Sequence, residues 1–271
     1  MRIVRFLSGG TEHLGSLVEG DDATAREIDG LLLDGPAGWN LTGRILRVEQ
    51  LLAPLVPTDI LCIGLNYREH AKESNSEVPD NPMLFIKSSN ALNHPGGPIP
   101  IPRRSTDIDY EGELCVVIGK TAKNVSKAEA LSYVLGYTCA NDVSARDWQK
   151  QKKLNGGQFA RGKSFDGFCP LGPWLVTADE VPNPNALKLR TLVNGRVLQD
   201  HTTADMIFDV PTLIESLSST MTLRPGAVIL TGTPQGVGAA RTPPVWLTPG
   251  DTVAVEIEGI GRLENPVTAE A

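Results

Sequence analysis

Glycine and proline recur along the whole chain and divide it into short apolar segments. The 271 residues include 27 glycines and 20 prolines, and the segments between them are rich in Val, Ile and Leu. Short apolar runs bounded by such residues are typical of β-strands joined by turns. The sequence therefore predicts a mostly β protein with some α-helix, in the α+β class.

The first 56 residues are predicted to form a small β-rich domain. Residues 2–7 and 14–18 are predicted strands, separated by a turn that contains a Gly-Gly pair. Residues 44–55 are predicted to be a helical or irregular connection. The main domain is then predicted over residues 57–271.

Strand signals dominate the main domain. The clearest is Asn194-Gly195, a dipeptide that favours a tight turn between two hairpin strands. Helices are predicted at residues 128–135, after the capping pair Ser126 and Glu129, and at residues 212–219. Strands are predicted at residues 60–65, 113–118, 136–140, 187–193, 197–199, 227–230 and 252–257.

The charge of the chain argues against nucleic-acid binding. The formal net charge is -7, and the basic cluster at residues 150–153 is too short to form a phosphate-binding surface. No stretch approaches the ~18 apolar residues of a membrane span, and the N-terminus has no apolar secretory segment. We therefore predict a cytoplasmic protein without nucleic-acid or membrane partners. Its four cysteines are predicted to be buried free thiols.

Two acidic residues lie two positions apart at the start of the strand predicted at 113–118. Alternate residues of a strand share a face, so Glu111 and Glu113 point the same way as Cys115 and Val117. Two carboxylates at the end of a partly apolar face repel each other and resist burial unless a cation lies between them. The pair therefore indicates a cation site, and a solvent-exposed acidic face is the alternative.

A second acidic pair shows that this spacing alone does not identify a metal site. Glu256 and Glu258 lie in a strand that alternates cleanly with apolar residues, so we predict that both face solvent. A third acid distinguishes the first pair, because Asp142 ends the strand at 136–140, where side chains commonly face a cleft. Three carboxylates without a nearby His or Cys cluster suit Mg²⁺, Mn²⁺ or Ca²⁺ rather than zinc.

Three further polar segments each have a functional and a structural interpretation. On a helical turn, Glu73 can raise the basicity of His70 and fix its tautomer, although the polar neighbours favour a plain exposed helix. Lys163, in a short loop, can supply positive charge to an enolate or pair with Asp166. The glycine-rich segment 231–238 lacks the spacing of phosphate and dinucleotide loops, and its amides can hold an anion or simply connect two strands.

Five segments, in this order, resemble the fumarylacetoacetate hydrolase family. The similarity extends over residues 57–268, and the first 56 residues resemble the variable N-terminal extension of bacterial-type members. The matching segments are residues 64–67 with His70, 109–114, 141–147, 162–166 and 231–238.

The resemblance implies a mixed β-roll catalytic domain, usually found in a homodimer. It also implies that Glu111, Glu113 and Asp142 bind a divalent metal, Mg²⁺ or Mn²⁺. No metal ligand of the family pattern is missing from this sequence.

The resemblance also assigns roles to residues around the substrate. It implies a catalytic pair of His70 and Glu73, on a lid that orders when substrate binds, together with Lys163. The positions that match substrate-contacting residues of the family are Arg146, Gln149 and Thr233.

The activity implied is chemistry on a small anionic 2-oxo acid. The leading prediction is hydrolysis of a carbon–carbon bond in an acylpyruvate or related 2,4-diketo acid, with a metal-stabilised enolate and water activated by His70. The alternative is decarboxylation of oxaloacetate, or tautomerisation of a related keto acid, at the same site. A catalytically silent metal-binding protein is the third interpretation.

Overall fold

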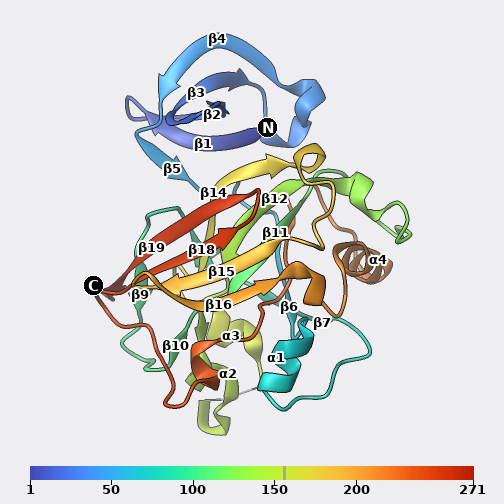
Figure 1. Cartoon of the computed structure of the whole chain (residues 1–271). Coiled ribbons are helices and arrows are strands. Elements are labelled where there is room, and N and C mark those ends of the chain that lie inside the picture. Colours follow the sequence, from blue (N-terminus) through green and yellow to red (C-terminus); the bar gives the residue numbers. More distant parts are fainter. Residues whose placement is uncertain (155–156) are drawn as a thin grey trace.

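β-Sheets make up most of the chain, and the computed structural model describes residues 1–154 and 157–271 (Figure 1). A twelve-stranded sheet runs from the N-terminal strands into the centre of the molecule. A five-stranded sheet packs beside it, and two short strands form a separate pair. The prediction of a mostly β chain with some helix is confirmed.

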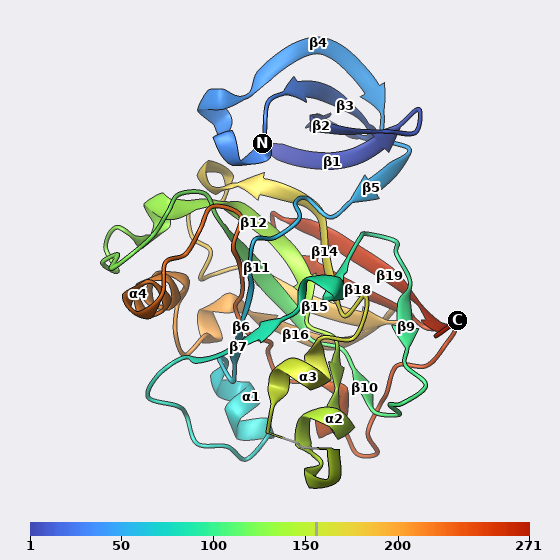
Figure 2. The same cartoon turned by 180° about the vertical axis from the view of Figure 1, so that it is seen from behind.

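The N-terminal strands form an antiparallel unit at one end of the molecule (Figures 1 and 2). They bury a small apolar cluster of their own around Val4, Phe6, Leu17 and Ala25. Strand β1 also pairs with β14 (Cys169–Thr177), so backbone hydrogen bonds join this unit to the main body. The N-terminal strands are β1 (Arg2–Ser8), β2 (Thr11–Val18), β3 (Asp21–Asp29), β4 (Asn40–Arg47) and β5 (Gln50–Leu52).

The prediction of a helical or irregular connection at residues 44–55 is wrong. Strand β4 pairs along β3, and β5 pairs with β1. Nearly all side chains of β4 are exposed, so its sequence lacks the apolar alternation that predicts a strand. Its conformation is decided by pairing with the edge of β3, because strand formation depends on neighbours as much as on local preference.

Strand β11 lies in the middle of the large sheet. It pairs antiparallel with β12 on one side and with β17 on the other, and all of its residues are buried. Leu114 and Val116 belong to one apolar cluster, whereas Cys115 and Val117 belong to another. The sheet continues from β14 through β12 (Val134–Asn141), β11 (Gly112–Ile118), β17 (Val228–Leu230) and β6 (Ile60–Gly64) to β7 (Met83–Lys87), with β8 (Leu92–Asn93) beside β14.

The second sheet contains the predicted hairpin. Asn194 and Gly195 have φ angles of 52° and 75°, and such positive values are what this tight turn requires. Glu256 is half-buried between the buried residues Val255 and Ile257 of β18. Glu258 faces solvent, as predicted, but it lies in the turn after β18 and not in the strand. The strand order is β16 (Arg196–Thr202), β15 (Lys188–Val193), β18 (Thr252–Ile257), β19 (Gly261–Ala269) and β9 (Ile99–Ile101), and the separate pair is β10 (Ile108–Asp109) with β13 (Ser144–Ala145).

Three short helices lie at the end of the molecule opposite the N-terminal strands (Figures 1 and 2). They are α1 (Arg68–Glu73), α2 (Arg146–Lys150) and α3 (Phe159–Lys163). The longer helix α4 (Val210–Thr220) packs against the main body, and the side chain of Asp209 accepts a hydrogen bond from the backbone N–H of Thr212. The helix predicted at residues 212–219 is confirmed.

The helix predicted at residues 128–135 is wrong. A 3-10 turn covers Ala130–Tyr133, and strand β12 begins at the next residue. The Ser126 hydroxyl donates to the Glu129 carboxylate at 2.7 Å, so the two side chains bond to each other. Val134 pairs with Ile118 of β11, and this sheet pairing ends the turn before a helix can extend.

All four cysteines are buried and free, as predicted. Among the described residues, no helix has the length and apolar character needed to cross a membrane.

We predict that Leu213→Ala destabilises the protein by about 2–5 kcal/mol, because it leaves a cavity beneath α4. Leu213 is fully buried in the core, whereas Leu31 is 71% exposed and provides a matched control. Leu31→Ala should change the free energy of unfolding by less than about 0.5 kcal/mol. Urea unfolding measures both values, and equal losses would contradict the assignment of this core.

Candidate active site and metal centre

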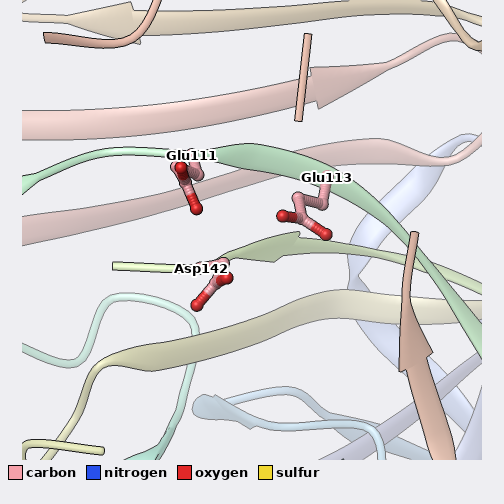
Figure 3. Close-up of side chains that lie close together, drawn as sticks. All are labelled: Glu111, Glu113 and Asp142. Atoms are coloured by element: carbon pink, nitrogen blue, oxygen red, sulfur yellow. The ribbon is translucent and has the colours of Figure 1, made fainter. Parts of the chain in front are cut away.

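Three acidic side chains meet where β11 and β12 run side by side. Glu111 immediately precedes β11, Glu113 is its second residue, and Asp142 immediately follows β12. The backbone N–H of Asp142 donates to the carbonyl oxygen of Glu111 at 2.9 Å, and this bond holds the start of β11 beside the end of β12. One carboxylate oxygen from each acid lies within 4.8 Å of the other two (Figure 3). The strand alternation predicted for Glu111 and Glu113 therefore brings both acids to Asp142.

Buried cations bind two of these carboxylates. The Lys163 ammonium lies between Glu111 and Asp142, at 2.6 and 2.5 Å, and the Arg146 guanidinium donates to Glu111 at 2.5 Å. Burial alone would raise the pKa of Glu111, but Arg146 and Lys163 outweigh it and hold that pKa well below its usual range. Glu111 is therefore ionised inside the protein.

Glu113 has a different environment. Its carboxylate accepts a hydrogen bond from the backbone N–H of Gly232 at 2.6 Å. Within the described part of the chain, no Lys, Arg or His nitrogen lies within 4.0 Å of it. Burial raises the pKa of Glu113 well above its usual range, and the charges of Asp142 and Glu111 raise it further. This carboxylate is the member of the triad that most needs a cation.

The balance of charge around the triad also fits a divalent cation. Four buried carboxyl groups, those of the triad and of Asp109, face three buried cations, Lys87, Arg146 and Lys163, and the ion pairs of these cations leave Glu113 without a counter-charge. Three converging carboxylates are a donor set that Mg²⁺ and Mn²⁺ favour. The residues present can therefore hold such an ion.

The prediction that Lys163 lies in a loop is wrong, and so is the alternative in which it pairs with Asp166. Lys163 is the last residue of α3, and its side chain is buried against the triad. Asp166 instead accepts a hydrogen bond from Asn90 at 2.6 Å. Burial lowers the pKa of Lys163, but Asp142 and Glu111 raise it more, so the net shift is upward. Lys163 is thus a fixed positive charge and not a neutral base.

Two buried residues of the site were not predicted from the sequence. Lys87, at the end of β7, donates to Asp142 at 2.5 Å and to the carbonyl oxygen of Val143 at 3.0 Å. Asp109 accepts hydrogen bonds from Arg146 at 2.8 Å and from the backbone N–H of Gly238 at 2.7 Å. The available signal for Lys87 was a charged residue closing an apolar strand, but nothing in the sequence identified its partner.

His70 and Glu73 form the hydrogen-bonded pair that their spacing predicts. The distance from His70 Nδ1 to Glu73 Oε2 is 3.1 Å, and the other Glu73 oxygen accepts from the backbone N–H of Gly236 at 2.8 Å. The exposed-helix alternative describes only the opposite face of α1, where Lys72 and Glu69 lie at the surface. The His70 side chain is 15% exposed and lines a pocket beside the triad.

That pocket has a volume of about 230 Å³. Apolar side chains, including Ile63, Phe85 and Phe159, form one part of its wall. Glu73 and Asp142 lie behind the wall, where they bind His70 and Lys163. The other predicted site residues line it: His70, Glu111, Glu113, Arg146, Gln149, Lys163 and Thr233.

Two of the predicted substrate-contacting residues have protein partners as well. The Thr233 hydroxyl donates to the carbonyl oxygen of Gly112 at 3.0 Å and accepts from Gln199 at 2.8 Å. The side-chain carbonyl of Gln149 accepts from Arg146 at 3.0 Å. These contacts hold both side chains in fixed orientations at the pocket wall.

A larger surface groove of about 950 Å³, lined in part by Arg2 and Trp174, contains none of the predicted site residues. Its charged side chains largely pair with one another, as Arg190 does with Glu256 at 2.7 Å. We therefore assign the chemistry to the smaller pocket, where the triad and the His–Glu pair converge.

We predict that Glu113→Gln stabilises the chelator-treated protein by about 1–3 kcal/mol. Burial without a cationic partner raises the pKa of Glu113, so on folding this carboxyl group must either take up a proton or stay as an unpaired charge, and Gln avoids both costs. The Gln side chain can still accept the hydrogen bond from Gly232. The same change should abolish the stabilisation that Mn²⁺ gives the wild type. Urea unfolding with chelator and with Mn²⁺ measures both effects, and Glu258→Gln should show neither. Destabilisation of the chelated protein by Glu113→Gln would contradict this account.

Both parts of the chain match known protein families. Residues 59–268 match the family described as fumarylacetoacetate (FAA) hydrolase C-terminal, and residues 1–54 match the family described as Rv2993c-like, N-terminal. The sequence is 49% identical to an oxaloacetate tautomerase, fahd2, from Xenopus laevis, a match that covers 80% of this chain and 68% of that protein.

Two mycobacterial proteins are similar over nearly the whole chain. Protein Rv2993c of Mycobacterium tuberculosis is 44% identical, with 93% of this chain and 91% of that protein covered. The crystal structure of 2-hydroxyhepta-2,4-diene-1,7-dioate isomerase from Mycobacterium marinum is 41% identical, with a TM-score of 0.84 and coverage of 100% and 99%. With its motifs, fold and acidic triad, the chain belongs to the fumarylacetoacetate hydrolase family.

Proposed function

We propose that this chain is a divalent-metal enzyme that tautomerises a small 2-oxo acid of the oxaloacetate type. One observation carries the proposal: a buried acidic triad, with Glu113 lacking a cationic partner in the described residues, shares a pocket with the His70–Glu73 pair. Relatives named as an oxaloacetate tautomerase and a dienedioate isomerase support this reaction class.

The relatives favour the alternative prediction over the leading one. Hydrolysis of an acylpyruvate and tautomerisation both need a stabilised enolate, but only hydrolysis also needs an attacking water molecule. The names of these relatives describe tautomerisation and isomerisation, which move a proton without adding water. Carbon–carbon hydrolysis remains the second candidate, because His70, held by Glu73, could also activate water. The homodimer and the cytoplasmic location stay predictions, as does the domain boundary after residue 56.

The proposed metal ligands are Glu111, Glu113 and Asp142. When bound, a divalent cation would supply a Lewis acid that stabilises negative charge on the substrate's 2-oxo group. Lys163, held at 2.6 Å from Glu111, adds a second fixed positive charge beside that position.

The proton transfers are assigned to the pocket wall. His70, oriented by Glu73, takes a proton from C3 of the 2-oxo acid, so the C3–H bond breaks and the enolate forms. The protonated His70 then gives this proton to the enolate oxygen, which completes the enol and restores the neutral imidazole, and the reverse steps return the keto form. Arg146, Gln149 and Thr233 hold the substrate carboxylate in position at the wall.

We predict that chelation lowers the exchange of the C3 protons of oxaloacetate with solvent to the rate measured without enzyme, while the fold persists. The fold should remain because Lys163, Arg146 and Lys87 already compensate much of the buried negative charge. Proton exchange followed by NMR in D₂O, with far-UV circular dichroism on the same sample, provides the test. Global unfolding on chelation would mean that the ion has a structural role.

We also predict that His70→Ala lowers the exchange rate by about 10²–10⁴-fold, the usual contribution of a positioned base, and leaves Mn²⁺ affinity unchanged. Glu73→Ala should lower the rate less, because Glu73 acts through the imidazole. His13 provides a matched control, since its Nδ1 lies 3.0 Å from Glu27 in a similar pair outside the pocket. His13→Ala should retain wild-type exchange. An active His70→Ala enzyme would rule out the proposed base.

A further inference from the structure

The three cations that line the pocket differ in what they bind. Arg146 pairs with Asp109 and Glu111, and Lys163 pairs with Glu111 and Asp142. Lys150 has no carboxylate within 4.0 Å of its ammonium in the part of the chain that the structure describes. Of the three, Lys150 is therefore the pocket cation that forms no ion pair with the described residues.

The position of Lys150 directs this charge toward the site. Arg146 and Lys150 are four residues apart on α2, so their side chains lie on the same helical face. Both line the pocket, but Arg146 is buried against the triad, whereas Lys150 is exposed. Arg146 therefore lies at the end of the pocket near the triad, and Lys150 lies at the end that is open to solvent.

The electrostatic surroundings of Lys150 favour an anionic partner. Although Lys150 reaches the surface, partial desolvation lowers the pKa of its ammonium, and the nearby positive charge of Arg146 lowers it further. The carboxylates of Asp109 and Glu111 act in the opposite direction without outweighing these effects. An anion beside Lys150 would offset this repulsion. Part of the remaining wall is formed by the apolar side chains of Ile63, Met83 and Phe85, which cannot bind an anion.

We infer that Lys150 is a specificity-determining residue that binds the second carboxylate of a dicarboxylic 2-oxo acid. The inference rests on the proposed function, which places the 2-oxo group and its carboxylate at the triad. A substrate anchored there by one end extends toward the open end of the pocket, where Lys150 meets a distal carboxylate. A 2-oxo acid with an apolar tail would lack this contact.

Oxaloacetate and 2-oxobutyrate test this directly, because a methyl group in the second replaces the distal carboxylate of the first. The measurements are C3 proton exchange and calorimetric binding for both acids, with the Mn²⁺-loaded protein. In Lys150→Met, the preference for oxaloacetate in kcat/KM and in Kd should fall about 10- to 100-fold, as expected for loss of a charged hydrogen bond. Lys150→Arg should restore most of it. Lys120→Met removes an exposed lysine outside the pocket and should keep the wild-type preference.

The outcomes separate this inference from the proposed function. If the wild type catalyses exchange but Lys150→Met keeps its preference for oxaloacetate, the role of Lys150 is overturned and the tautomerase proposal stands. If no exchange occurs but the binding preference is lost in Lys150→Met, the role of Lys150 stands and the tautomerase proposal fails. A wild-type protein that binds both acids equally well would overturn the inference, since Lys150 would then be a solvated surface lysine.

Discussion

Compensation of buried negative charge is the constraint on which the rest of this site depends. Carboxylates resist transfer from water into a protein interior unless cations or hydrogen-bond donors accompany them. Here each cation comes from a different element: Lys87 from β7, Arg146 from α2 and Lys163 from α3. Ion pairs with Glu111 and Asp142 thus connect the two short helices to the end of the sheet.

The compensation is incomplete at one position, and that position gives the site its chemistry. Glu113 receives an N–H group from Gly232, whereas its neighbours receive ammonium and guanidinium groups. The same glycine-rich loop reaches the His–Glu pair, because the N–H of Gly236 donates to Glu73. One loop therefore contacts both the triad and the residue that orients the proposed base, which keeps the two parts of the pocket in register.

Close packing around this loop leaves little freedom for substitution. A Cβ atom at Gly238 would lie 1.9 Å from the carbonyl oxygen of Val245 and 2.7 Å from the carboxylate of Asp109. The absence of a side chain lets the Gly238 N–H approach Asp109, which in turn fixes Arg146 against Glu111. The close approach of the Gly238 backbone to Asp109 therefore helps to fix the position of the Arg146 guanidinium beside the triad.

The sequence by itself determined the mostly β composition, the Asn194-Gly195 hairpin and the shared face of Glu111 and Glu113, because each follows from local preference or from the alternation of a strand. Only the tertiary structure decided which residues pair with these acids and which strands pair with each other. The Lys87–Asp142 contact joins residues 55 positions apart. Strand β4 exists because β3 offers an edge. Partners in ion pairs and sheets depend on how segments distant in the sequence pack together, and local sequence patterns do not predict this packing.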